Sequence, residues 1–173
     1  MEKSKPNQPK YDRQFTRVDK VKDIMDARLY SLQDECKKRN AYVHLYGVGQ
    51  AASLLALKRN MGRETAELAQ IAGMLHDYTK YLEEDTDDHA ERSAPYAEAV
   101  LQETKAFTSE EIAVVCQGIA RHSNKADIDT PFDEVIKDAD ALQHYLRNPM
   151  EDFWLKNDRI QALLRELGME LCM

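Results

Sequence analysis

The sequence has little glycine, proline and cysteine, with six, five and three residues respectively among 173. Glycine and proline break helices, so their scarcity favours helical structure. Helices are also favoured by the abundance of Ala, Leu, Glu, Lys and Arg, whose side chains lose little rotamer freedom in a helix. No segment alternates between apolar and polar residues as a half-buried strand does. We therefore expect an all-α protein, a single-domain helical bundle of six to seven helices.

The cysteines, Cys36, Cys116 and Cys172, are odd in number and include no CxxC pair. This pattern argues against a disulfide framework and favours small buried side chains in a reducing compartment. The sequence also lacks a run of 18 apolar residues, and its amino terminus lacks the apolar core of a signal peptide. We therefore predict a cytoplasmic protein with no membrane partner.

Basic residues are not in excess, since the formal net charge is -7. That balance argues against charge-driven binding to nucleic acid or to an anionic membrane. It permits a small phosphorylated substrate, because a bound cation can reverse the local field inside one cleft.

The length suits one domain. Residues 1–16 contain two prolines and many polar groups without a period, so they predict a flexible N-terminal tail, and residues 17–173 form the expected helical domain. Apolar periodicity and capping signals predict helices over 18–39, 41–60, 63–82, 88–104, 109–122, 131–147 and 152–167.

Several residues are expected to set the helix boundaries. Asn40 is predicted to separate the first two helices, Met61-Gly62 to end the second, and Gly168 to end the last. Pro95 is expected to kink or break the fourth helix. The first and last helices could pack internally or against a second subunit, so a homodimer is left open; the apolar residues concerned in the last helix are Trp154, Leu155, Leu163 and Leu164.

Four of the five histidines, and two aspartates, fall at helical positions that should face inward. A single buried histidine is usually structural. Buried aspartates are costlier, because a carboxylate in a dry interior must neutralise or find a cation. Several such groups in one bundle core therefore point to a bound metal; the residues are His44, His76, Asp77, His89, His122 and Asp140.

The segment AGMLHDYTK, residues 72–80, resembles the signature of the HD superfamily of metal-dependent phosphohydrolases. In that signature a helix rich in Leu and small residues ends in His-Asp, with Lys three positions after the Asp. The ordered set H…HD…H…H…D spans about residues 41–147. The resemblance implies an HD-domain fold in which a first metal is held by His44, His76, Asp77 and Asp140. It also implies a second metal bridged by Asp77 and held by His89 and His122.

Imidazole and carboxylate ligands suit divalent Fe, Mn, Co, Ni or Zn, and the absence of clustered Cys argues against a thiolate zinc site. The resemblance implies two ions roughly 3.5–4 Å apart that cleave a phosphate ester by metal-bound hydroxide. Asp77 and Lys80 are then the catalytic residues. Lys80 could contact a phosphate or orient Asp77, although a solvated lysine at a helix end is an equal alternative.

Other charged residues near the motif carry weaker expectations. Arg121 and Lys125 flank His122 and could neutralise substrate phosphate or be surface charge. His144, one turn after Asp140, is predicted to be structural or to support the metal ligands. The acidic stretch lacks the spacing and glycine of an EF-hand, so we expect a solvated loop; its residues are Glu83, Glu84, Asp85, Asp87 and Asp88.

The motif also limits the substrate. Guanosine tetraphosphate hydrolases carry an acidic pair where this chain has Lys80-Tyr81, and no segment resembles the GYP motif of cyclic-dinucleotide phosphodiesterases. The six-ligand set and HDYTK are similar to those of the two-metal hydrolases that split diadenosine tetraphosphate symmetrically. The chain departs from these enzymes in two places. After His122 those enzymes have Thr and a nearby Gly, whereas this chain has Ser123-Asn124-Lys125. The segment after the last Asp, ALQHYLRN, also differs.

We therefore predict a hydrolase acting on a nucleotide or another small phosphate ester or anhydride, with a dinucleoside polyphosphate as one candidate. A regulatory or ligand-binding module of the same fold, without turnover, is the alternative. A purely structural bundle would leave two buried aspartates without a partner.

Overall fold

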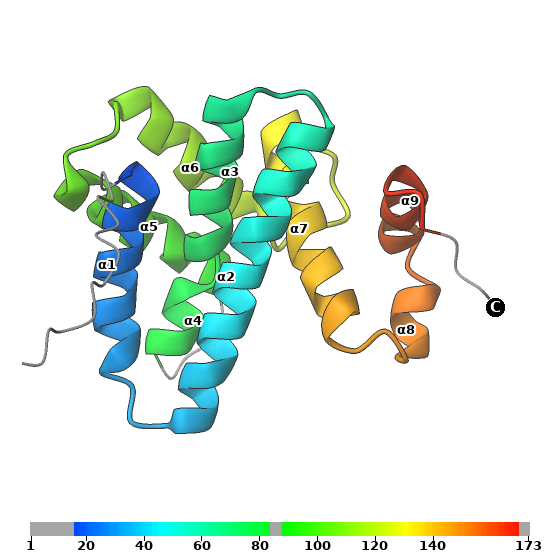
Figure 1. Cartoon of the computed structure of the whole chain (residues 1–173), viewed down its shortest axis with the longest axis horizontal. Helices are drawn as coiled ribbons and strands as arrows, with labels where there is room; N and C mark the ends of the chain where they lie inside the picture. The colour runs from blue at the N-terminus through cyan, green and yellow to red at the C-terminus, as the bar shows by residue number, and fades with distance from the viewer. Residues whose placement is uncertain (1–15, 84–87, 170–173) are drawn as a thin grey trace, which may run out of the picture.

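The computed structural model describes residues 16–83 and 88–169, apart from the side chain of Leu155. Every regular element in these ranges is a helix, which confirms the all-α prediction (Figure 1). The described chain contains nine helices rather than six or seven, because two expected helices are each split. The helices are α1 Arg17–Tyr30, α2 Glu35–Lys58, α3 Arg63–Leu75, α4 Tyr78–Leu82, α5 His89–Thr104, α6 Ser109–Arg121, α7 Pro131–Arg147, α8 Asp152–Leu155 and α9 Asp158–Glu166.

Three sequence-based expectations fall outside the described residues. These are the flexible tail up to residue 15, residues 84–87 of the acidic loop, and Cys172. Thr16, the last residue assigned to the tail, belongs to the folded part because its side chain caps α1.

The long helix α2 runs through the middle of the molecule and packs against α3 on one side and α7 on another (Figure 1). The pair α5 and α6 covers the far side of α3, and α1 packs across α5, α2 and α3. The buried apolar residues of α1, among them Val21, Met25 and Leu29, join this single core. None of the described helices is long and apolar enough to cross a bilayer.

The predicted boundary at Asn40 is wrong. Helix α1 already ends at Tyr30, and α2 begins at Glu35, so Asn40 lies inside α2. The break is set by Asp34, whose carboxylate accepts hydrogen bonds from the backbone N–H groups of Cys36 and Lys37. Residues 33–40, QDECKKRN, contain a single apolar residue, Cys36, so apolar periodicity does not locate the break.

The helix predicted over residues 63–82 is split at His76-Asp77 into α3 and α4. The His76 ring donates from Nδ1 to the Gly73 carbonyl at 2.8 Å, and Asp77 leaves helical geometry at φ -109° and ψ 19°. The split turns the HD pair out of the regular helix while both side chains stay buried.

Four other predicted boundaries agree with the structure, at the starts of α6 and α7 and at two glycines. Helix α6 begins with a capping box at Thr108, and α7 begins with a capping box at Thr130 followed by Pro131. Gly62 and Gly168 have positive φ at the predicted chain breaks. Helix α5, in contrast, continues through Pro95, so the expected break there is wrong; the proline removes one backbone hydrogen bond without ending the helix.

The predicted last helix is also split, into α8 and α9, because Asn157 caps a new helix by accepting from the Ile160 N–H at 3.2 Å. Leu163 and Leu164 of α9 are buried in the main core, so this part of the last helix packs internally. Helices α8 and α9 lie beside α7 at the edge of the bundle (Figure 1).

Candidate metal centre

The close approach of α2 and α3 brings the first two histidines together. A Cβ on Gly73 would lie 2.8 Å from the Gly49 Cα, so only glycine permits this helix crossing. As a result, the Nε2 atoms of His44, on α2, and His76, at the end of α3, lie 3.3 Å apart. Both side chains are buried.

Three imidazoles of the cluster use Nδ1 to donate a hydrogen bond. His76 donates to the Gly73 carbonyl at 2.8 Å, and His122 donates to the Ile119 carbonyl at 2.7 Å. His44 contacts the Gln143 side-chain oxygen from Nδ1 at 2.7 Å. A neutral imidazole carries one hydrogen, so each Nε2 presents a lone pair to the centre of the cluster.

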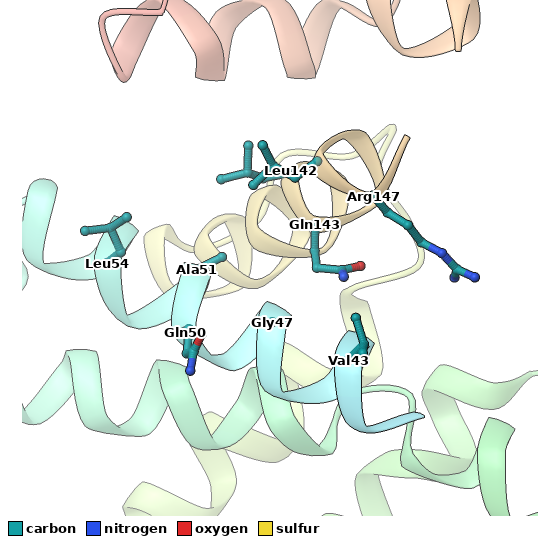
Figure 2. Close-up of a pocket in the computed structure, with 9 residues that line it drawn as sticks. Val43, Gly47, Gln50, Ala51, Leu54, Leu142, Gln143 and Arg147 are labelled. Atoms are coloured by element: carbon teal, nitrogen blue, oxygen red, sulfur yellow. The ribbon is translucent and has the colours of Figure 1, made fainter. Parts of the chain in front are cut away.

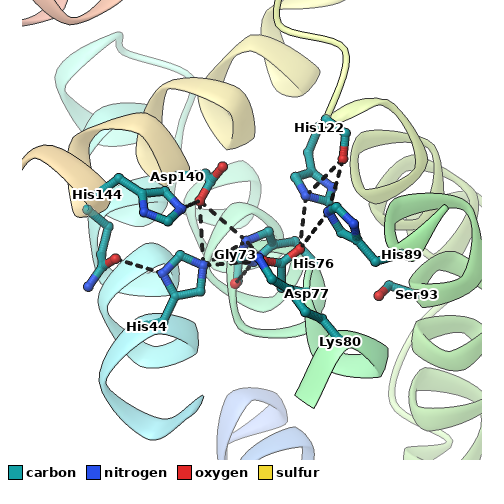
Figure 3. Close-up of polar contacts among 12 residues, drawn as sticks. His44, Gly73, His76, Asp77, Lys80, His89, Ser93, His122, Asp140 and His144 are labelled. Atoms are coloured by element: carbon teal, nitrogen blue, oxygen red, sulfur yellow. Dashed lines mark hydrogen bonds and ion pairs between the residues drawn. The ribbon is translucent and has the colours of Figure 1, made fainter. Parts of the chain in front are cut away.

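Asp77 turns its two oxygens toward two different groups of imidazoles (Figure 3). Its Oδ1 lies 3.2 Å from Nε2 of both His89 and His122. Its Oδ2 lies 3.5 Å from His44 Nε2 and 3.6 Å from His76 Nε2. One carboxylate thus stands between two sets of nitrogen atoms.

Asp140 reaches the same place from α7. Its Oδ1 lies 3.5 Å from His44 Nε2, 3.6 Å from His76 Nε2 and 3.3 Å from His144 Nε2 (Figure 3). This oxygen is buried and has no hydrogen-bond donor among the described residues. That agrees with the tautomers above, since His44 and His76 have no hydrogen on Nε2 to give.

Burial and proximity set the charge of the cluster. Burial raises the pKa of Asp77, but positive charge on the neighbouring imidazoles of His76, His122 and His44 would outweigh it and hold that pKa below its usual range, as a cation bound among their nitrogen atoms would. Burial likewise raises the pKa of Asp140, and the contact with His144, together with the positive charge of Lys125, brings it well below its usual range. Burial lowers the pKa of His76. Ionised carboxylates and neutral imidazoles are the forms that bind a divalent metal.

These residues fit a divalent cation on chemical grounds. Lone pairs that face one another and two buried carboxylates repel unless a positive charge lies among them. His44, His76 and Asp77 form one group whose ligand atoms could hold an ion, and Asp77, His89 and His122 form another. Asp140 completes the first group through its contacts with His44 and His76.

The family model of the HD domain matches residues 41–145, more than half of the chain. The chain belongs to the HD domain family. That family is generally one of metal-dependent hydrolases, and the match covers all six residues of the cluster. No curated protein and no solved structure matched the chain.

The two lysines predicted near the HD site both contact its carboxylates. Lys80 Nζ lies 3.0 Å from Asp77 Oδ2, the contact expected if Lys80 orients Asp77. Lys125 forms an ion pair with Asp140. Each lysine side chain is partly exposed, so each joins the buried cluster to solvent.

Arg121 is directed elsewhere. Its guanidinium lies 3.1 Å from Asp133 and 3.5 Å from Asp129, which ties α6 to the start of α7. The predicted contact between Arg121 and substrate phosphate has no support in this geometry. Asp133 is buried, so the arginine neutralises a carboxylate in the helix interface instead.

Two polar residues at the HD site were not predicted. Gln143 accepts from His44 and lies over Gly47, where an added Cβ would be 3.0 Å from the Gln143 Cγ (Figure 2). Ser123 Oγ lies 3.2 Å from His89 Nε2 and 3.4 Å from His122 Nε2. The position of Gln143 three residues after Asp140, on the same helix face, is the sequence signal that could have identified it.

Proposed function

We propose that this HD domain protein is a metal-dependent phosphohydrolase that cleaves a nucleotide or another small phosphate ester or anhydride. The observation that carries the proposal is the convergence of three Nε2 lone pairs on two buried carboxylates, with Asp140 Oδ1 lacking a donor among the described residues. Lys80 and Lys125 pair with these carboxylates from partly exposed positions. The buried Asp140 Oδ1 and the Nε2 lone pairs of His44 and His76 still have no donor among the described residues, as expected where a metal ion binds.

The contacts support an assignment of the proposed ligands to two sets. His44, His76, Asp140 and Asp77 Oδ2 would hold one ion, and His89, His122 and Asp77 Oδ1 would hold the other. Two divalent transition-metal ions, such as Fe, Mn, Co, Ni or Zn, would lower the pKa of an attacking water and neutralise the phosphate oxygens. Asp77 would fix the position of the two ions relative to each other, because one of its oxygens belongs to each ligand set.

The chain's own residues also supply charge for the substrate. Lys80 and Lys125 each reach the cluster from a partly exposed position, next to Asp77 and Asp140 respectively. Metal ions would neutralise the carboxylates of Asp77 and Asp140. The two ammonium groups would then be free to form hydrogen bonds with the phosphate oxygens of the substrate, on the solvent side of the metal centre. Lys80 would also keep Asp77 oriented.

Within this substrate class, a symmetrical dinucleoside polyphosphate is one candidate. It is supported by the six-residue set and by HDYTK, which are similar to the enzymes that split diadenosine tetraphosphate. Ser123, which replaces the Thr of those enzymes, still supplies a hydroxyl beside His89 and His122. The site thus keeps a hydrogen-bonding group at the position where the sequences differ.

Asp77→Asn tests the proposal directly. Metal analysis of the purified protein should find a transition metal in the wild type and much less in the variant, since one carboxylate serves both sets. Hydrolysis of a panel of nucleotides, dinucleoside polyphosphates and simple phosphate esters should fall by about a thousandfold or more.

Asp23→Asn, at an exposed carboxylate on α1, is the matched control and should change neither measurement. Turnover that survives Asp77→Asn would rule out the metal mechanism. Bound metal together with a nucleotide-dependent rise in melting temperature, but no cleavage of any substrate, would instead identify a binding module.

A further inference from the structure

Helix α8 places an aromatic side chain beside the proposed metal centre. The Trp154 ring stacks on His144, with centroids 5.7 Å apart and planes at 11°. His144 Nε2 in turn lies 3.3 Å from Asp140 Oδ1. One stacked ring therefore separates Trp154 from a proposed metal ligand.

Phe153 extends this aromatic surface outward. Its ring packs edge-to-face against Trp154, with centroids 5.0 Å apart and planes at 78°. The Phe153 side chain is 67% exposed. A large aromatic side chain left in water gives up hydrophobic free energy, and such exposure next to a polar site is typical of a ligand surface.

A pocket of about 450 Å³ is lined by both of these rings and by Lys125. We call it the aromatic pocket; its lining includes Lys125, Phe153, Trp154 and Asn157. Lys125 also pairs with Asp140, so one wall of the pocket is shared with the metal centre. The volume lies within the range of small-molecule sites, about 300–1,000 Å³.

We infer that the aromatic pocket binds the base of a nucleotide whose phosphates lie at the metal centre, an inference that rests on the proposed function. Aromatic side chains stack on any base, because every base has a π-face. Lys125 stands between the pocket and Asp140, where a cation would contact the phosphate that follows the nucleoside. The substrate is then a nucleotide rather than a phosphate ester without a base.

The groove between α2 and α7 does not offer the same chemistry. It is larger, about 620 Å³, but none of the described residues that line it is aromatic (Figure 2). Its lining is mainly aliphatic and includes Leu54, which is 57% exposed. Leu54→Ala therefore removes an exposed apolar side chain outside the aromatic pocket and serves as the matched control.

The experiment uses Trp154 as its own reporter, because it is the only tryptophan of the chain. The metal-loaded protein is titrated with the α,β-methylene diphosphates of adenosine, guanosine, cytidine and uridine, which resist cleavage at that bridge. Methylenediphosphonate, which carries the same diphosphonate without a nucleoside, is the matched ligand. Calorimetry gives the affinity in parallel for every variant.

At least one nucleoside analogue should change the Trp154 fluorescence and bind about 5- to 100-fold more tightly than methylenediphosphonate. Phe153→Ala and Trp154→Leu should remove most of that difference and leave the affinity for methylenediphosphonate unchanged. Leu54→Ala should leave both affinities as they are. Phe153 is exposed, so its removal tests the pocket without disturbing the core.

Three contrary outcomes are distinguishable. If methylenediphosphonate binds but no nucleoside adds affinity, the base pocket is wrong and the proposed phosphohydrolase stands. If neither ligand binds and no metal is retained, the proposed function is wrong, and the base pocket, which rests on it, is wrong too. A change in oligomeric state in Phe153→Ala, with nucleotide affinity intact, would assign the aromatic surface to a second copy and overturn the inference.

Discussion

At the scale of single residues, three imidazoles of the cluster have Nδ1 occupied by a hydrogen bond within the protein. His76 and His122 use backbone carbonyls of their own helices for this purpose, three residues earlier in each case. His44 depends instead on a side chain from another helix, Gln143 of α7. The orientation of His44 is therefore the most easily changed by substitution.

Gln143→Leu should weaken metal binding by about 10- to 100-fold, the usual effect of removing the partner of a metal-bound histidine. The reason is that His44 loses the acceptor that keeps its hydrogen on Nδ1. Competition with a chromogenic chelator measures the affinity. Gln143→Glu keeps an acceptor oxygen and should stay close to wild type, whereas equal metal affinity in Gln143→Leu and wild type would contradict this role.

At the scale of helices, the site depends on how closely α2 and α3 cross. The contact at Gly49 and Gly73 is backbone against backbone, since a Cβ on Gly73 would also lie 2.9 Å from the Gly49 nitrogen. This crossing places His44 next to His76. The break that follows, at His76-Asp77, then points both side chains of the HD pair inward.

Gly73→Ala should have two opposing effects on the free energy of unfolding. Alanine favours the helix by about 1 kcal/mol over glycine. Its Cβ would meet the backbone of α2, which cannot move as a flexible side chain can, and overpacking of this kind costs about 1–3 kcal/mol. We expect a net loss of unfolding free energy in urea denaturation and weaker metal binding.

Gln50→Ala, at an exposed position on α2, is the control for Gly73→Ala and should stay within about 0.5 kcal/mol of wild type. A Gly73→Ala protein more stable than wild type would show that propensity outweighs packing and that the two helices can separate without penalty.

At the scale of the whole molecule, a network of charges fastens the C-terminal segment to the bundle. Arg159 of α9 lies 2.8 Å from Glu134 and 2.6 Å from Asp138, both on α7. Lys137, fully buried, lies 3.0 Å from Glu134 and 2.7 Å from Asp129. The network therefore keeps α9 against the helix that carries Asp140.

The network predicts a pH dependence. Burial raises the pKa of Glu134, but hydrogen bonds from the Asp129 N–H, Lys137 and Arg159 outweigh it and lower the pKa from 4.5 to about 2. A carboxylate whose pKa is lowered on folding stabilises the protein above its unfolded pKa and loses that contribution as pH falls through the folded value. Glu134 should thus lose its contribution between about pH 4.5 and about pH 2.

Glu134→Gln should be less stable than wild type by about 1–2 kcal/mol near pH 7, because two charged donors lose their ionised acceptor. The difference should shrink as the pH falls toward 2 and disappear below it, where wild-type Glu134 is protonated too. Urea denaturation of both proteins across this range measures the difference. The same difference at pH 7 and at pH 3 would contradict the assignment.

The sequence alone predicts the helical fold, several helix boundaries and the HD motif. Its composition determines an all-helical chain, and the capping residues Thr108, Thr130 and Pro131 mark the starts of α6 and α7. The ordered histidines and aspartates around His76-Asp77 identify the HD domain, because few other arrangements would place ionisable groups on so many apolar faces. These features are local, so a pattern of residues along the chain is enough to reveal them.

The tertiary structure decided the rest. The breaks at Asp34, His76-Asp77 and Asn157 come from side-chain hydrogen bonds that periodicity does not register. The contact of Gln143 with His44 and the stacking of Trp154 on His144 join residues from different elements. Such contacts depend on how closely helices approach and which faces meet, and these are set by packing across the whole core rather than by the order of residues in any one segment.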